Sequence, residues 1–126
     1  MKTYTIADYR SGFVAEHDMQ AALIDNLRVR ARRDVHWFAI PNAGKRTPRT
    51  AARMQQEGLQ AGVADLCIML PGGRVIWVEL KTSKGRQSAA QKAFQSVCET
   101  LDHPYLMPRS LDEAIVLLRA EGVLMR

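Results

Sequence analysis

The sequence predicts one α/β domain, in which a four-stranded mixed sheet is flanked by helices. Short apolar runs rich in β-branched residues alternate with longer segments in which apolar residues recur at helical spacing. The chain has 126 residues, of which 47% are hydrophobic, enough for one core of ordinary domain size. We therefore expect residues 1–126 to form a single domain, with residues 1–12 as an irregular N-terminal arm.

The first part of the chain predicts a helix, a strand and a second helix. Apolar residues recur at helical spacings from Phe13 to Arg33, with acidic residues early and arginines late, as the helix dipole favours. Val35 to Ile40 reads as a short strand, because it is apolar and precedes a Pro-Asn-Ala-Gly turn signal. Thr50 to Leu59 has a helical composition, and Gly58 or Gly62 would close that helix.

A hairpin forms the centre of the predicted sheet. Its strands are Leu66 to Leu70 and Val75 to Leu80, and a Pro-Gly-Gly turn joins them. If those three residues form the loop, the numbers of paired residues sum to 144, which places Asp65 directly opposite Glu79. Directly opposed residues have Cβ atoms about 4.5–5.5 Å apart. The two carboxylates would therefore repel each other unless a cation lies between them.

The last part of the chain predicts a helix, a short strand and a final helix. Ser88 is placed to cap a helix that runs to Leu101 and is broken by a His-Pro step. Tyr105 to Met107 can lie parallel to the second hairpin strand, since a strand, helix, strand crossover of this length is the usual right-handed unit. Ser110 to Glu113 has the pattern of a capping box for a helix that ends near Glu121.

Positive charge is concentrated in one part of the chain. The net charge is +5, but residues 28–53 hold eight basic residues and one acidic residue, and the rest of the chain sums to −2. Such a segment favours phosphate binding, although a solvated helix face has the same composition. No apolar run reaches the roughly 20 residues of a membrane span, and no signal sequence is evident, so we expect a soluble cytoplasmic protein. Cys67 and Cys98 are 31 positions apart, which favours core thiols over metal ligands.

Asp65, Glu79 and Lys81 are the candidate catalytic cluster. Lys81 follows Glu79 by two positions, so the alternation of a strand puts both side chains on one face. Carboxylates are ligands that Mg²⁺ or Mn²⁺ prefers, and the backbone carbonyl of Leu80 could add another. Lys81 would help to activate an attacking water and offset charge that builds on a phosphate. The alternative is purely structural: a Glu79–Lys81 ion pair at the end of the sheet, with Asp65 in a turn.

Three segments resemble the VRR-NUC (virus-type replication-repair nuclease) domain, a branch of the PD-(D/E)XK nuclease superfamily with a restriction-endonuclease-like core. They are Gly62 to Leu66, Val78 to Lys81 and Gly85 to Gln91. The resemblance covers nearly the whole chain, and its weaker matches are Glu16-His17 with Gln20, Pro41-Asn42 before Gly44-Lys45-Arg46, and Arg109 to Ala114. Ala64 stands where the family usually has proline, a departure that affects the local geometry alone.

The resemblance implies a role for each matching residue. Asp65 and Glu79 match the metal-binding acids, Lys81 the catalytic lysine, and Gln91 a glutamine that supports the site from the following helix. Glu16 matches the first-helix acid, which in this superfamily reaches the metal directly or through a water. A first-turn acid that simply favours a helix start is the alternative for Glu16. The implied cofactor is Mg²⁺ or Mn²⁺.

The resemblance also implies an activity. Stand-alone phage and bacterial members of the family are described as homodimeric resolvases of four-way (Holliday) DNA junctions, which act in DNA recombination and repair. We therefore expect a metal-dependent endonuclease that works as a homodimer in the cytoplasm of a bacterium or phage-infected cell. The alternatives are a non-catalytic or nicking DNA-binding module for flaps or duplex, and a regulatory protein whose basic helix binds RNA. The residues expected to contact DNA are Asn42, Lys45, Arg46, Arg49, Lys84 and Arg86.

Overall fold

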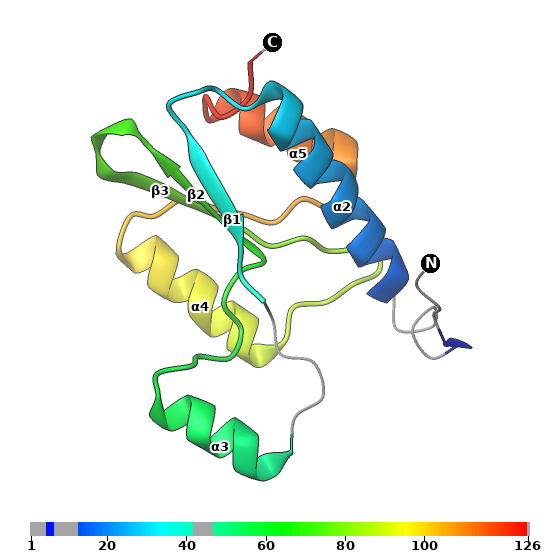
Figure 1. The fold of residues 1–126 in the computed structure, drawn as a ribbon, viewed down its shortest axis with the longest axis vertical. Coiled ribbons are helices and arrows are strands. Elements are labelled where there is room, and N and C mark those ends of the chain that lie inside the picture. Colours follow the sequence, from blue (N-terminus) through cyan, green and yellow to red (C-terminus); the bar gives the residue numbers. More distant parts are fainter. Residues whose placement is uncertain (1–4, 7–12, 42–46, 126) are drawn as a thin grey trace.

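The protein is described by a computed structural model that covers residues 5–6, 13–41 and 47–125 (Figure 1). Four strands form one sheet in the order β1-β2-β3-β4, and helices lie on both of its faces. The predicted α/β class with a four-stranded mixed sheet is confirmed. The strands are β1 His36–Ala39, β2 Leu66–Leu70, β3 Arg74–Val78 and β4 Tyr105–Leu106. The helices are α2 Phe13–Arg30, α3 Pro48–Gln56, α4 Ala89–Thr100 and α5 Leu111–Ala120.

The strand register matches the register expected from the turn. β1, β2 and β3 pair antiparallel, and β4 pairs parallel with β3. Leu66 pairs with Val78 and Leu70 with Arg74, so the paired numbers sum to 144 as predicted. The connecting turn Pro71–Gly73 contains Gly72 at φ +80°, a left-handed conformation that glycine adopts without steric cost. The second hairpin strand ends at Val78 and not at Leu80, because residues 79–81 leave the ladder with β2 while they stay bonded to the β4 side.

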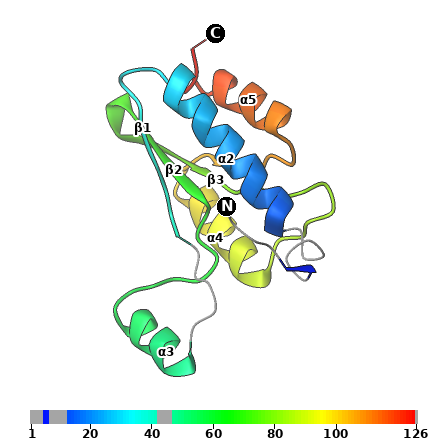
Figure 2. The ribbon, with the colours of Figure 1, turned by 45° about the vertical axis from the view of Figure 1, so that its right-hand side comes forward.

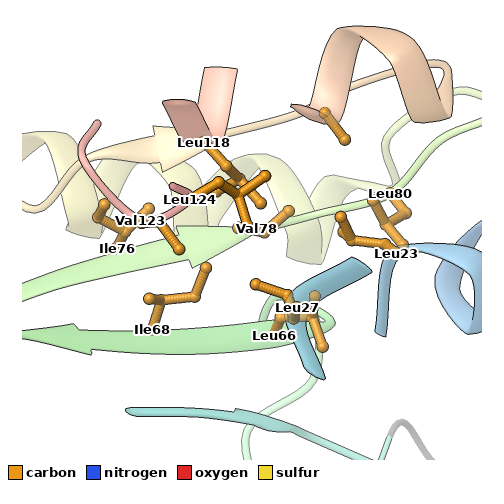
Figure 3. Packing of buried hydrophobic residues seen from close by; sticks show 11 residues of the cluster. Leu23, Leu27, Leu66, Ile68, Ile76, Val78, Leu80, Leu118, Val123 and Leu124 are labelled. Atoms are coloured by element: carbon orange, nitrogen blue, oxygen red, sulfur yellow. The ribbon is translucent and has the colours of Figure 1, made fainter. Parts of the chain in front are cut away.

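The main core lies between one face of the sheet and the two helices α2 and α5, which run side by side (Figures 1 and 2). Leu23 and Leu27 of α2 and Leu118 of α5 are fully buried against β2 and β3 (Figure 3). Each leucine of this kind stabilises the fold by roughly 1.5–3 kcal/mol through removal of its surface from water. This packing holds α2, and with it Glu16 near its start, over the sheet.

A smaller cluster lies under α4 on the opposite face of the sheet. Phe94 and Cys98 of α4 are buried there, and Trp77 meets Phe94 edge to face at a ring-centroid distance of 5.2 Å. Trp77 also donates a hydrogen bond from Nε1 to His103 Nδ1 at 3.1 Å, so His103 does more than mark a turn. Both cysteines are buried free thiols, and burial raises the pKa of each above its usual value.

Two helices begin or end at residues other than those that the sequence predicts. α2 ends at Arg30 and not at Arg33, because the next residues turn to the C-terminal segment, where the Arg32 N–H donates to the Val123 carbonyl. α3 begins at Pro48 and not at Thr50, because Thr47 caps it and proline suits the first helical position. α3 ends at Gln56 and Gly58 follows at φ +101°, one of the two closing glycines expected.

The start of α5 departs in part from the predicted capping box. The Ser110 hydroxyl accepts a hydrogen bond from the Glu113 N–H, as expected. The Glu113 carboxylate instead accepts from the N–H of Arg109, one residue before the cap. In the helix itself Ala114 and Leu118 are buried, while Ile115 and Leu117 are only partly covered.

α3 stands apart from the rest of the domain (Figures 1 and 2). It has no buried residue, and it is inserted between the end of β1 and the start of β2. The N-terminal arm expected at residues 1–12 lies outside the described residues, except for positions 5 and 6. No helix in the described part of the chain is long and apolar enough to cross a membrane.

Candidate active site at the open end of the hairpin

Asp65 lies one residue outside the β2–β3 ladder and is fastened on both sides. Its carboxylate Oδ2 accepts a hydrogen bond from the backbone N–H of Leu80 at 2.7 Å. Its own carbonyl accepts from the N–H of Ile40 at 2.8 Å, just beyond β1. These bonds hold the Asp65 carboxylate at the open end of the hairpin, across from the residues that follow β3.

Glu79 is almost completely buried, with 1% of its surface exposed. Its Oε1 accepts a hydrogen bond from Gln91 Nε2 at 2.6 Å and lies 3.7 Å from Lys81 Nζ. Among the described residues, no group donates a hydrogen bond to the buried Oε2. An ionised carboxylate oxygen that is buried without a donor costs free energy, so the ionised form of Glu79 calls for a partner that the side chains do not supply.

The surroundings of Glu79 raise its pKa from the usual value near 4.5 to about 8. Burial is the main cause, and the negative charge of Asp65 and a hydrogen bond shared with that carboxyl act in the same direction. The ammonium of Lys81 opposes the shift. Without a bound cation the Glu79 carboxyl therefore keeps a proton near neutral pH, and a divalent cation would replace that proton.

Lys81 shares the face and the burial of Glu79, with 7% of its surface exposed. The backbone on either side is fixed by a continuation of the parallel pairing. The N–H of Glu79 donates to the Leu106 carbonyl at 2.8 Å, and the N–H of Lys81 donates to the Pro108 carbonyl at 3.1 Å. The ammonium is thus held inside the site by the backbone and does not reach into solvent.

Glu16 reaches the same cluster from the first turn of α2. Burial and the charge of Asp65 raise its pKa above the usual value, while Lys81 and a hydrogen bond with the backbone of Thr82 lower it. The Glu16 carboxyl is therefore close enough to Asp65 and Lys81 for their charges to shift its pKa. The helix and the two strand ends therefore bring together residues that are far apart in the sequence.

Gln91 is oriented by the cap of α4. Its Oε1 accepts from the Ser88 N–H at 2.8 Å, and the Ser88 hydroxyl accepts from the Gln91 N–H at 3.1 Å, which completes a capping box. Because the amide oxygen is engaged by the backbone, the amide NH₂ group must face Glu79. The capping box at the start of α4 thus fixes which group of Gln91 donates a hydrogen bond to the buried Glu79 carboxylate.

Gly62 allows α4 to approach this end of the hairpin closely. It has φ +84°, and a Cβ at this position would lie 2.3 Å from the carbonyl carbon of Ala90 and 2.7 Å from the nitrogen of Gln91. No side chain fits in that space. The glycine before Asp65 therefore lets the backbone of Gln91 come close to the site.

The donor set fits a small divalent cation. Two carboxylates, Asp65 and Glu79, converge at the strand ends, and Mg²⁺ commonly uses one or two protein carboxylates together with water. In the described part of the chain, no three Asp, Glu, His or Cys side chains gather closely enough to hold an ion by themselves. The residues that would hold a cation are therefore Asp65, Glu79 and the carbonyl of Leu80, with Glu16 acting through a water.

The predicted DNA contacts fall in two described regions. Lys84 and Arg86 are exposed on the loop that directly follows Lys81. Arg49 is exposed on α3, at the end of the sheet where β1 stops and β2 starts. Three further candidates, Asn42, Lys45 and Arg46, lie outside the described residues.

Arg109 bonds the loop beside the site, but no local sequence pattern predicts this contact. Arg109 Nη1 donates to the carbonyl of Thr82 at 2.8 Å and to the carbonyl of Gly85 at 2.7 Å. These contacts span 27 and 24 positions, so no periodicity or turn pattern reveals them. Arg109 lies in the Arg109 to Ala114 segment that resembles the family, but no motif in the sequence predicts its contacts with residues 82 and 85.

The topology and this cluster define an α/β domain with a buried acid and lysine site at the open end of its central hairpin. No family model matches the chain, and no curated protein matches it. A solved VRR_NUC domain protein superposes with a TM-score of 0.66 over 82% of this chain and 84% of that chain, at 18% identity. A second solved structure, described as a VRR_NUC domain, superposes with a TM-score of 0.59 over 82% of this chain and 94% of that chain, at 15% identity. The chain has the VRR-NUC fold.

Proposed function

We propose that this protein is a metal-dependent DNA endonuclease that hydrolyses phosphodiester bonds. Its active site would consist of Asp65, Glu79 and Lys81. The observation that carries the proposal is the buried Glu79 carboxylate, whose Oε1 is bonded to Gln91 and whose Oε2 has no donor among the described residues. A divalent cation is the partner that this oxygen and the adjacent Asp65 carboxylate suit best.

The structural alternative explains less of the geometry. The Glu79 Oε1 and Lys81 Nζ atoms do lie 3.7 Å apart, as an ion pair would require. Such a pair does not account for Asp65, whose charge raises the pKa of Glu79 and so works against an ionised pair. Because a buried ion pair is a weak source of stability even without a third charge, a purely structural role for this cluster is disfavoured.

Each residue has a definite task in the proposed reaction. Bound Mg²⁺ or Mn²⁺ would neutralise charge on the scissile phosphate and make an attacking water more acidic. Asp65 is held in place by the Leu80 N–H, and Gln91 holds Glu79, so the two carboxylates need little reorganisation. The ammonium of Lys81 is positioned to orient the attacking water and to offset negative charge that develops on the phosphate.

We further propose that the substrate is branched DNA and that the active form is a homodimer. Exposed basic residues on α3 and on the loop after Lys81 provide phosphate contacts on the side of the site. A four-way junction requires two symmetric cuts, and a two-fold dimer presents two equivalent sites. Phe38 and Met69 are exposed apolar residues on one face of β1 and β2, and they offer a surface for a second copy.

Cleavage of defined DNA structures tests both levels of the proposal. Purified protein is incubated with end-labelled four-way junction, flap and linear duplex in Mn²⁺, with EDTA as the metal-free control, and its mass is measured by light scattering. Paired cuts confined to the junction by a dimer support a resolvase. Equal cutting of linear duplex contradicts junction specificity but keeps the nuclease. Absence of cutting on every substrate contradicts the nuclease and favours a non-catalytic DNA-binding module.

A substitution of Lys81 separates catalysis from binding. Lys81→Met keeps most of the side-chain volume and removes the charge, and we expect cleavage to fall by about 10²–10⁴-fold while DNA affinity is largely retained. Lys92→Met, at an exposed lysine of α4, is the matched control and should cleave normally. Equal activity of the two variants would exclude a catalytic role for Lys81.

A further inference from the structure

We propose that Arg109 is a positioning residue for this site, which fixes the loop after Lys81 so that Thr82 and Gly85 stay beside the Glu16 carboxylate. The inference rests on the proposed function and extends it to a residue outside the acid and lysine cluster. Arg109 itself contacts neither of the two carboxylates that would bind a cation.

The guanidinium of Arg109 closes the loop from Thr82 to Gly85. One of its nitrogens donates to both ends of this turn, to Thr82 O at 2.8 Å and to Gly85 O at 2.7 Å. The turn has a single internal backbone bond, from the Gly85 N–H to the Thr82 carbonyl at 3.1 Å. Arg109 therefore supplies the charge-assisted and stronger part of the bonding that keeps the loop in this conformation.

Arg109 is itself held on the main body of the domain. Its N–H donates to Glu113 Oε2 at 3.2 Å, in the first turn of α5. The residue before it, Pro108, is buried and accepts from the N–H of Lys81 at 3.1 Å. The two consecutive residues Pro108 and Arg109 thus fasten two consecutive residues of the site strand, Lys81 and Thr82.

The loop held by Arg109 is also the part of the chain that contacts Glu16. The backbone of Thr82 lies near the Glu16 carboxyl and lowers its pKa. A Cβ at Gly85 would lie 3.5 Å from Glu16 Oε1 and 3.1 Å from Thr82 Oγ1, so the loop passes close to both groups. Release of the Arg109 contacts would let Thr82 and Gly85 move away together from the Glu16 carboxylate.

Arginine suits this task better than lysine. Its planar guanidinium presents several donors in fixed directions and stays charged at any working pH, whereas a lysine ammonium is a single flexible point. Bonding to two carbonyls at once from a half-buried position uses this rigidity. Arg109→Lys should therefore retain part of the function, and Arg109→Gln should retain little of it.

The molecule contains a matched control for a merely structural effect. Arg74, at the other end of β3, also donates from Nη1 to a backbone carbonyl, that of Glu121 at 2.9 Å. Arg74→Gln removes an arginine–carbonyl contact, together with the ion pair to Glu121, at the far end of the hairpin and leaves the site untouched. Comparison of Arg74→Gln with Arg109→Gln therefore separates loss of stability from loss of positioning.

Two measurements test the inference. In metal-free protein, amide hydrogen exchange of the Gly85 N–H should accelerate in Arg109→Gln and stay unchanged in Arg74→Gln. With saturating DNA and Mn²⁺, Arg109→Gln should lower kcat by about 10–100-fold, Arg109→Lys should recover part of that loss, and Arg74→Gln should match the wild type. Unchanged exchange, or equal kcat for the two glutamine variants, overturns the positioning role.

A double-mutant cycle checks that Arg109 acts through Glu16. If it does, Glu16→Gln combined with Arg109→Gln should lose no more kcat than Glu16→Gln alone. Independent, multiplying losses would overturn this route. If the wild-type protein cleaves no DNA, the proposed function fails, and the exchange comparison still decides whether Arg109 fixes the loop.

Discussion

The charged side chains at the two ends of the β2–β3 hairpin differ in how far they are buried. At the turn end Arg74 pairs with Glu121, and both side chains remain partly exposed to solvent. At the open end Glu79 and Lys81 are buried next to Asp65, and one Glu79 oxygen has no donor in the described part of the chain. The same two strands and one register connect these ends.

This difference shows that the hairpin does not require buried charge. Removing an ion pair from water costs several kcal/mol per ion, and well-packed apolar residues can serve the fold equally well. The open end therefore carries a cost that the turn end avoids. A binding or catalytic task at the open end accounts for that cost, and stability measurements at the two ends can sharpen the contrast.

The largest expected difference between the ends concerns two glycines with nearly the same φ angle. Gly62 and Gly72 have φ +84° and +80°, but a Cβ at Gly62 would lie 2.3 Å from the backbone of Ala90, and one at Gly72 meets nothing within 4 Å. Gly72→Ala should cost about 1–2 kcal/mol of unfolding free energy through its left-handed conformation alone. Gly62→Ala should cost about 1–3 kcal/mol more, because α4 must move. Urea unfolding measures both, and equal losses would contradict the close approach.

The next effect is a pH dependence of stability in metal-free protein. The folded-state pKa of Glu79, about 8, lies above its ordinary value of 4.5, so the folded protein binds this proton more tightly than the unfolded chain. The resulting stability is complete below about pH 4.5 and is lost as the pH rises through about 8. The pKa of Glu16 is raised in the same direction.

Thermal unfolding in EDTA between pH 6 and pH 8.5 measures this loss. Tm should fall with rising pH, and Mn²⁺ should restore it more strongly at the higher pH because the cation replaces the proton. Glu79→Gln resembles the protonated form, so its Tm should depend less on pH and should not respond to Mn²⁺. An equally steep decline in Glu79→Gln would assign the effect to other groups.

The smallest effect concerns the cap of α4. Ser88→Ala removes one hydrogen bond of the capping box and should cost about 1 kcal/mol of stability. It should also lower kcat, because Gln91 loses the frame that directs its amide to Glu79. Thr47→Ala removes the equivalent cap of α3, which lies apart from the site, and should leave kcat at saturating DNA unchanged. A similar fall in both variants would argue against orientation of Gln91 by its cap.

Local patterns in the sequence were sufficient for much of the site. A three-residue turn between two apolar runs defines the register, whose last pair is Leu66 with Val78, and this brings Asp65 and Glu79 to the same end of the hairpin. Strand alternation then places Lys81 on the face of Glu79, and a serine at the right spacing caps α4. These features depend on residues close in sequence, where turn and helix chemistry is decisive.

The features that escaped prediction depend on contacts between distant segments. The end of α2 is set by backbone bonds to residues 123–125, which helical periodicity does not register. Glu113 bonds Arg109 and not its own cap, because the chain enters α5 from the loop-holding segment. The hydrogen bonds from Arg109 to the carbonyls of residues 82 and 85 likewise form only because the sheet pairs β3 with β4.

The isolation of α3 has a consequence for the motions of the chain. A nine-residue helix is marginal by itself in water, and α3 buries no side chain against the domain. Its opening therefore breaks few tertiary contacts and requires far less free energy than global unfolding. Residues 48–56 form a local folding unit that can open and close while the sheet and the Glu79 site remain intact. Binding of a polyanion to Arg49 and Arg53 would slow that opening.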